Sequence, residues 1–281
     1  MPGMHSPSTP APAPALVRAA FTLQGEGFSL SLQATVPAGP ARQADLLPLA
    51  RAIADTVVAQ TQQAVEAAGQ RISCHAGCGA CCRSLVAISE PEARRLQAHI
   101  AALPEARRHE LHRRFDTALA ALEGAGLLGT LQQWAGWSEA EYRRQLTAYF
   151  AAGVPCPLLE DESCGLYAER PITCREFLVT SPPRHCGELG SDQIRRVALP
   201  VKMFNAVARW QPRPAGDDGE GGNSGNGGKS GEGSDMGGGS DVQERWVPLV
   251  LALAWAETHP DDTPARHGPE LLRELLAALN P

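Results

Sequence analysis

Eight cysteines are the residues in this sequence whose type and spacing could carry chemistry. The first four, in the run CHAGCGACC, are Cys74, Cys78, Cys81 and Cys82. The last four are dispersed, and they are Cys156, Cys164, Cys174 and Cys186. About seventy cysteine-free residues separate the two groups, which we call the first and second quartets. This grouping is far from random scatter and asks for a chemical reason.

Three kinds of cysteine chemistry compete. Structural disulfides are disfavoured because adjacent Cys81 and Cys82 sit poorly with ordinary disulfide geometry. The N-terminus also lacks the basic start and apolar stretch of a secretory signal, so we expect a cytoplasmic protein with reduced thiols. Inert buried thiols could explain one or two cysteines, but not four in nine residues interleaved with glycine. Metal ligation is the favoured interpretation, because soft thiolates at short gaps are what zinc and iron–sulfur centres use.

All eight cysteines are therefore predicted metal ligands. On a helix, Cys74, Cys78 and Cys81 would share one face, whereas Gly77 and Gly79 favour a knuckle in which backbone N–H groups turn towards sulfur. Zinc is typically held by paired CxxC knuckles, and irregular gaps like those of the second quartet are common for iron–sulfur ligands. We place an iron–sulfur cluster of the 4Fe–4S type slightly ahead of Zn²⁺. Two centres and one binuclear site both remain open.

Basic residues near the cysteines could offset the negative charge of the thiolates. Four thiolates around a divalent ion leave an excess of two negative charges, which neighbouring donors can balance. The candidates are Arg71, Arg83, Arg170, Arg175 and Arg184, and of these we assign Arg83, Arg170 and Arg175 to the surroundings of the cofactor. His75 and His185 each adjoin a cysteine, but four-thiolate ligation needs no histidine, so we interpret both as loop residues.

The cysteine motifs resemble a known family. CGACC followed by Arg83, CPLL at 156–159, SCGLY at 163–167 and ERPITCREF at 169–177 are similar to the YkgJ-type cysteine-cluster proteins. These are the CxxCxxCC family, described as putative zinc- or iron-chelating proteins. The resemblance covers about residues 70–190. One departure is the first gap, where three residues instead of two separate Cys74 from Cys78.

The resemblance implies a metal-binding protein, with an enzyme as the alternative. The family includes flagellin lysine N-methylases, which look like iron–sulfur proteins that use S-adenosylmethionine. The alternative is therefore an iron–sulfur-dependent enzyme of methyl- or electron-transfer type. No Gly-rich nucleotide loop follows a strand here. The Cys74–Cys78–Cys81 spacing also matches the radical S-adenosylmethionine signature, but no βα alternation accompanies it. We therefore prefer metal binding, with the catalytic residues unknown.

Hydrophobic patterning predicts a mainly α fold with a short N-terminal β-hairpin, in which a helical core surrounds a cysteine-rich loop region. Residues 20–36 alternate apolar and polar around Gly25 and Gly27, which indicates a hairpin. Apolar spacing and capping signals predict helices over about 45–68, 89–102, 104–122 and 138–150. Residues 193–210 read as a short strand or turn followed by a helix, and 156–190 as loop with short helical turns.

Composition divides the chain of 281 residues into four parts. Residues 1–15 form a disordered Pro/Ala arm, 16–211 the helical cysteine-cluster metal-binding domain, and 212–241 a flexible Gly/Ser/acidic linker. Residues 242–281 are too few for a core of their own, so we expect them to dock on the core as helices.

Charge and hydropathy limit the partners. The net charge is −6, and the linker, with six acidic and two basic residues, supplies −4 of it. The near-neutral remainder does not predict nucleic-acid binding. No apolar run reaches the roughly 18 residues of a membrane span. The partner indicated is a metal ion or cluster, and the sequence indicates no particular protein partner.

Overall fold

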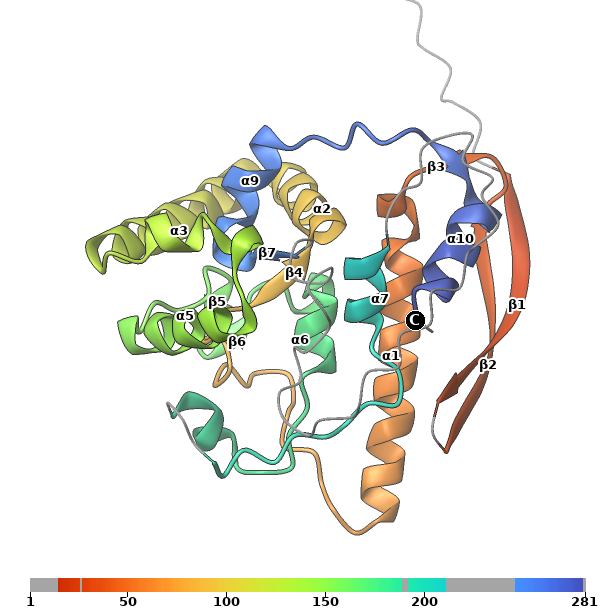
Figure 1. Cartoon of the computed structure of the whole chain (residues 1–281), viewed down its shortest axis with the longest axis horizontal. Coiled ribbons are helices and arrows are strands. Elements are labelled where there is room, and N and C mark those ends of the chain that lie inside the picture. Colours follow the sequence, from red (N-terminus) through yellow and green to blue (C-terminus); the bar gives the residue numbers. More distant parts are fainter. Residues whose placement is uncertain (1–14, 26, 189–191, 211–245, 280–281) are drawn as a thin grey trace, which may run out of the picture.

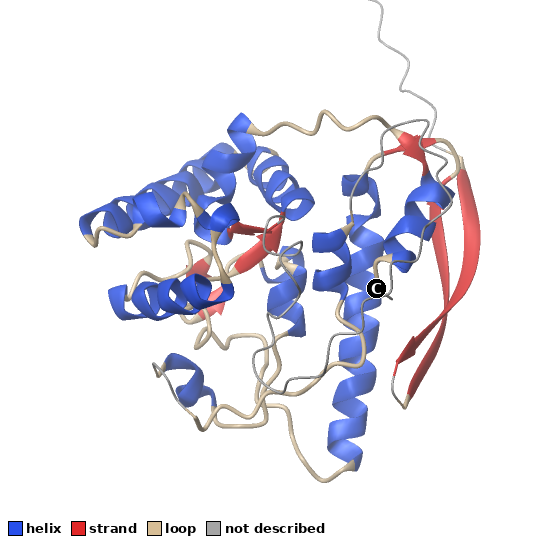
Figure 2. Ribbon diagram, viewed as in Figure 1, coloured by secondary structure: helices blue, strands red, loops and turns tan. Residues whose placement is uncertain are grey.

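The computed structural model describes residues 15–25, 27–188, 192–210 and 246–279. The linker predicted over 212–241 and, apart from its last residue, the arm predicted over 1–15 lie outside these residues. Helices make up most of the described chain, and the strands form small two-stranded sheets (Figures 1 and 2). The prediction of a mainly α fold with an N-terminal β-hairpin is confirmed.

The hairpin is longer than the sequence pattern indicated. Strands β1 (Leu16–Gly25) and β2 (Phe28–Pro37) pair antiparallel over their whole lengths, from Leu16 opposite Pro37 to Gly25 opposite Phe28. Leu23, Leu30 and Val36 are buried in the core. The hairpin thus covers one side of the molecule, where β2 contacts helix α10 (Gly268–Ala277) (Figure 1).

Helix α1 (Gln43–Ala67) is the long central element, and its apolar stripe explains its position. Leu46, Leu47, Ala50, Ile53 and Val57 follow helical spacing and are almost fully buried. The helix contacts α2 (Glu90–Ala101), α10, α6 (Ile172–Glu176) and α7 (Met203–Arg209). It therefore packs against helices from the N-terminal, cysteine-rich and C-terminal parts of the described chain.

The remaining predicted helices are present with boundaries shifted by a few residues. They are α2 (Glu90–Ala101), α3 (Glu105–Gly124) and α5 (Glu139–Ala152), with a short α4 (Leu128–Leu131) between the last two. Ser89 and Glu92 form the predicted capping box of α2. Helix α5 starts at Ser138, whose hydroxyl accepts a hydrogen bond from the Glu141 N–H, and ends at Gly153 in the left-handed conformation.

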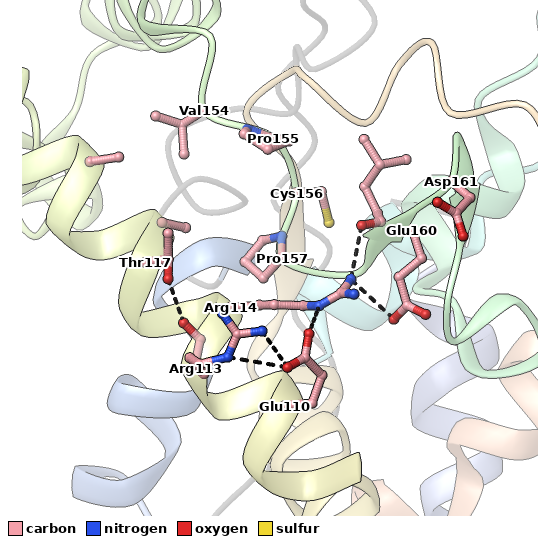
Figure 3. A pocket seen from close by; sticks show the side chains of 13 residues that line it. Glu110, Arg113, Arg114, Thr117, Val154, Pro155, Cys156, Pro157, Glu160 and Asp161 are labelled. Carbon is pink, nitrogen blue, oxygen red and sulfur yellow. Dashed lines mark hydrogen bonds and ion pairs between the residues drawn. The ribbon is translucent and has the colours of Figure 1, made fainter. Parts of the chain in front are cut away.

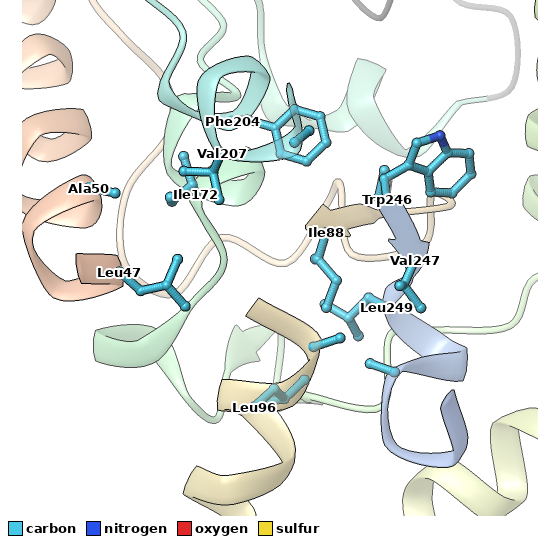
Figure 4. Close-up of a cluster of buried hydrophobic side chains, with 14 of the residues drawn as sticks. Leu47, Ala50, Ile88, Leu96, Ile172, Phe204, Val207, Trp246, Val247 and Leu249 are labelled. Carbon is cyan, nitrogen blue, oxygen red and sulfur yellow. The ribbon is translucent and has the colours of Figure 1, made fainter. Parts of the chain in front are cut away.

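Residues 246–279 add a strand and helices to the same core. Strand β7 (Trp246–Pro248) pairs antiparallel with β4 (Ala87–Ser89), and α9 (Ala252–Thr258) packs against α2. Two shorter strands, β3 (Pro40–Ala41) and β8 (Arg266–His267), also pair. Figure 4 shows Ile88 of β4 beside Val247 and Leu249, within one cluster of buried side chains that extends to α1, α6 and α7.

The region 156–190 departs from the prediction in one respect. It contains the expected short turns of 3₁₀ helix (Tyr167–Glu169 and Pro183–Gly187) and the short α6. It also contains a small β-hairpin, β5 (Leu159–Glu160) paired with β6 (Ser163–Cys164), that we did not predict. Among the described helices, none combines the length and the apolar character that crossing a membrane requires.

Candidate metal centre

The first quartet lies on a series of tight turns between α1 and β4, not on a helix. Backbone hydrogen bonds run from the N–H of Cys78 to the carbonyl of His75 (3.2 Å) and from the N–H of Cys82 to the carbonyl of Gly79 (3.0 Å). Gly77 has a φ of 88°, a conformation that favours glycine. Of the two geometries that the sequence left open, the turn form is the one observed.

A backbone hydrogen bond joins the two quartets. The N–H of Cys156 donates to the carbonyl of Cys82 at 2.7 Å. The chain then turns back through the β5–β6 hairpin, where Cys164 is paired with Leu159. Strand β5 begins three residues after Cys156. The hairpin therefore returns Cys164 to the neighbourhood of Cys156.

Cys174 and Cys186 are held by other elements. Cys174 lies on α6, whose first N–H, from Ile172, donates to the buried carboxylate of Glu92 at 2.7 Å. Cys186 lies in the 3₁₀ turn that follows. The first quartet meets this part of the chain as well, because the Ser73 N–H donates to the Val179 carbonyl (2.9 Å) and the Cys74 thiol to the Phe177 carbonyl (3.7 Å).

Both quartets contribute to a small cavity. Its wall includes Cys74, Cys78 and Cys81 from the first quartet and Cys186 from the second, together with apolar side chains such as Phe177 and Val179. Its volume is about 10 Å³, roughly the minimum that holds one water molecule. Cysteines far apart in sequence are thus brought to one place.

The thiols also influence one another electrostatically. A hydrogen bond from the Cys82 thiol lowers the pKa of Cys81 and raises that of Cys82, because it stabilises the Cys81 thiolate. Burial raises the pKa of Cys156 to about 12 and that of Cys174 well above its usual value, and neighbouring thiols raise both further. Burial, followed by the charges of Cys81, Cys74 and Cys78, raises the pKa of Cys186 to about 11. Thiols with such raised pKa values become thiolates readily only when a cation is present.

Arg170 is the arginine most closely associated with the thiols. Burial raises the pKa of Cys74 and of Cys164, and the positive charge of Arg170 opposes both rises. The Arg170 guanidinium lies over the Tyr167 ring at 4.3 Å, and its buried Nε has no hydrogen-bond partner. An unpaired buried donor is costly, so this one is suited to a negatively charged acceptor.

The other two predicted arginines have different contacts. Arg83 donates to the Gly79 carbonyl at 3.1 Å and pairs with Glu162, which ties the first quartet to the β5–β6 turn. Arg175 is buried and donates to both oxygens of Asp55 (2.9 and 2.7 Å) and to the Arg170 carbonyl (2.9 Å). It therefore positions the Arg170 backbone.

Arg196 is a residue near the thiols that the sequence did not reveal. Burial raises the pKa of Cys186, and the charge of Arg196 opposes that rise. The position of Arg196 follows from an isolated antiparallel bridge with Val179. No spacing or composition signal announces such a bridge, because it joins two segments without regular strand patterning.

The neighbouring histidines have partners of their own. His75 is exposed, with Nδ1 at 2.7 Å from the Ala76 carbonyl, and buried His185 has Nδ1 at 3.0 Å from the Glu188 carboxylate. All eight cysteines are free thiols. In the described part of the chain, no three Cys, His, Asp or Glu side chains already stand as they would around a metal ion. Binding therefore requires the gathered thiols to rotate towards a common point.

A larger cavity lies beside Cys156, between α3 and residues 154–161 (Figure 3). Its volume is about 450 Å³. Arg114 lies on its wall, where it donates to Glu110 at 2.7 Å and to the Leu159 carbonyl at 3.1 Å. Arg113 and Arg114 both form ion pairs with Glu110, and Arg114 also pairs with Glu160. No signal in the sequence indicates this cavity, because α3 and the second quartet are brought together only by the fold.

Free thiols gathered from both quartets define a cysteine-cluster domain. Comparison with known families agrees: residues 73–193 match the model of the CxxCxxCC family, described as a putative zinc- or iron-chelating domain. The YkgJ-type label refers to this same family, so the resemblance that the motifs predicted is confirmed over residues 73–193. No curated protein and no solved structure matches the chain.

Proposed function

We propose that this protein binds zinc or iron through the thiolates of both quartets. The ligands are Cys74, Cys78, Cys81, Cys82, Cys156, Cys164, Cys174 and Cys186. The observation that carries the proposal is the meeting of the two quartets, through the bond between Cys156 and Cys82 and through the cavity shared with Cys186. Thiolates are soft ligands that suit zinc and iron–sulfur centres.

The surroundings of the thiols support an anionic metal–thiolate centre. Arg170 brings a positive charge and a buried Nε without a partner. Arg83 directly follows Cys82 in the chain. The hydrogen bond to Glu162 is the main cause of the raised pKa of Arg83, and the charge of Cys82 raises that pKa further. Arg175 acts through the Arg170 backbone. Such neighbours orient the ligands and offset the charge of the centre.

Two observations bear on the kind of metal centre, and they favour different answers. The second quartet comes from a turn, a strand, a helix and a 3₁₀ turn, and ligands from such separate elements are common for iron–sulfur clusters. This favours a cluster, of the 4Fe–4S type. The cavity of about 10 Å³, with four cysteines in its wall, instead has the size of a single ion such as Zn²⁺.

The test is purification under anaerobic conditions, followed by measurement of zinc, iron and acid-labile sulfide. A brown protein with sulfide and absorbance near about 400 nm identifies the cluster, and a colourless protein with zinc identifies the ion. Cys81→Ser should lower the bound metal. His75→Ala is the matched control, since this exposed neighbour of Cys74 is outside the ligand set. A native protein without either metal, in which all eight thiols react freely, would refute the proposal.

The proposed function also requires that the protein reside in a reducing compartment, and we propose the cytoplasm. Metal ligation requires free thiols, and thiols stay reduced in that compartment. All eight cysteines are free in the structure, which agrees with this requirement.

A second candidate function is an iron–sulfur-dependent enzyme of methyl- or electron-transfer type. The cavity of about 450 Å³ beside Cys156 favours it, because binding sites for small molecules typically fall in this size range. Equilibrium dialysis of the metal-loaded protein against S-adenosylmethionine tests it. Saturable binding that Arg114→Ala weakens supports an enzyme, and no binding leaves the metal-binding function alone.

A further inference from the structure

The arrangement of the eight thiols does not follow their order in the sequence. Cys74, Cys78 and Cys81 line the small cavity, but Cys82, the last member of the first quartet, does not. The fourth cysteine on that wall is Cys186, the last member of the second quartet. The cavity wall thus contains Cys186 of the second quartet in place of Cys82 of the first.

The remaining thiols are connected with one another. Cys82 accepts the backbone hydrogen bond of Cys156, and the β5–β6 hairpin returns Cys164 towards Cys156. Cys174 lies on α6 and, like these three cysteines, is absent from the wall of the small cavity.

The first quartet divides between Cys81, which lines the cavity, and its neighbour Cys82, which does not. They are adjacent in a tight turn, and Cys81 lines the cavity with Cys186, whereas Cys82 is absent from that wall and its backbone carbonyl accepts the hydrogen bond from the Cys156 N–H. The dipeptide therefore gives one thiol to each side.

We propose that the eight thiols form two adjacent four-thiolate centres, each for one soft metal ion or cluster. Centre A contains Cys74, Cys78, Cys81 and Cys186. Centre B contains Cys82, Cys156, Cys164 and Cys174. This inference rests on the proposed function, since it assumes that the thiols bind metal. Four thiolates complete a tetrahedral site, so neither centre needs a histidine.

Arg170 serves both centres in this arrangement. Its charge acts on Cys74 and Cys81 of centre A and on Cys164 of centre B. A divalent ion with four thiolates leaves two negative charges at each centre, and a nearby cation offsets part of that excess.

Cobalt titration of the metal-free protein under anaerobic conditions tests the partition, with the bound ions counted by native mass spectrometry. The wild type should bind two Co²⁺. Cys74→Ser with Cys186→Ser, and Cys82→Ser with Cys174→Ser, each damage one centre and should leave one ion. Cys74→Ser with Cys82→Ser is the matched control, because it damages both centres and should leave none.

The alternatives give different patterns. If each centre followed one sequence quartet, the control pair would keep one ion and the other two pairs would keep none. If the thiols formed one shared centre, the wild type would bind a single ion. Either result overturns the partition while metal binding stands. A wild type that binds no Co²⁺ overturns the proposed function itself.

A second measurement avoids variants that fail to fold. Wild-type protein with one equivalent of Co²⁺ is alkylated, and the modified cysteines are mapped by mass spectrometry. Protection of one complete set, either that of centre A or that of centre B, supports the partition. Joint protection of Cys81 and Cys82 with the other members of the first quartet contradicts it.

Discussion

Replacement of Gly79 by alanine should separate the two segments that carry the quartets. Gly79 is buried in the first cysteine turn, and a Cβ there would lie 2.5 Å from Leu159 Cδ1 and 2.8 Å from the Glu162 carbonyl oxygen. The leucine can rotate away, but the Glu162 backbone cannot easily move. It forms the β5–β6 turn, in which Asp161 and Glu162 have φ values of 46° and 59°.

The expected cost follows from this contact. Forcing additional carbon atoms into a packed interior typically costs about 1–3 kcal/mol, which is roughly a 5- to 150-fold fall in the folding equilibrium constant. The displaced turn carries Cys164, so the affinity for metal should fall as well. In terms of the two proposed centres, centre B should be weakened more than centre A.

Chemical denaturation followed by circular dichroism measures the free energy of unfolding of the metal-free protein, and cobalt titration measures the affinity. Gly187→Ala is the matched control, since it adjoins Cys186 while its new Cβ would have its nearest contact at 4.0 Å, with the Ala80 carbonyl oxygen. If Gly79→Ala and the control unfold within about 0.5 kcal/mol of each other and bind cobalt equally, the close approach described here does not hold the site together.

Three further changes test the surroundings of the thiols. Arg170→Gln removes a positive charge that favours thiolates, so the midpoint of acid-induced metal release should move up by about one pH unit, as followed by a zinc-sensitive dye. Glu92→Ala leaves the Ile172 N–H and the Ser89 donors without their buried acceptor; it should cost about 3 kcal/mol in urea unfolding, and Glu92→Gln should cost less. Burial raises the pKa of Glu176 from 4.5 to about 7, so its contribution to stability is complete below about pH 4.5 and is lost as the pH rises through 7. Relative to Glu176→Gln, the metal-free wild type should lose about 3 kcal/mol of stability across that window, and a constant difference would contradict the raised pKa.

Local signals in the sequence were sufficient for most helices. The capping pair Ser89 and Glu92 marked the start of α2, and the apolar spacing from Leu46 to Val57 marked α1. The β5–β6 hairpin was missed because its turn residues are Asp161 and Glu162, whereas two-residue turns with positive φ usually contain Asn-Gly or Asp-Gly. Strand pairing between β4 and β7 was also beyond sequence patterning, since it joins segments more than 150 residues apart.

The cysteines identified the kind of site but not its internal arrangement. Their spacing predicted a metal-binding region, and the family model supports that prediction. The neighbours of each thiol depend on contacts that no spacing reveals, such as the Cys156 N–H to Cys82 bond and the bridge that places Arg196. Arg175 shows the same limit, because its nearness in sequence to Cys174 does not reveal that it binds Asp55 of α1.

Removal of the metal should leave the fold in place. The segments that carry the thiols are joined by contacts that contain no metal, including the bonds from Ile172 to Glu92 and from Cys156 to Cys82. They also rest on a large apolar core that includes Ile88, Ile172 and Leu47. Small zinc fingers lack such a core and unfold without their ion. Here a chelator should therefore remove the metal with little change in far-UV circular dichroism, while the thiols become reactive towards alkylating reagents. Loss of the helical signal at the same chelator concentration would instead mean that the metal, and not the core, holds α6 and the β5–β6 hairpin in position.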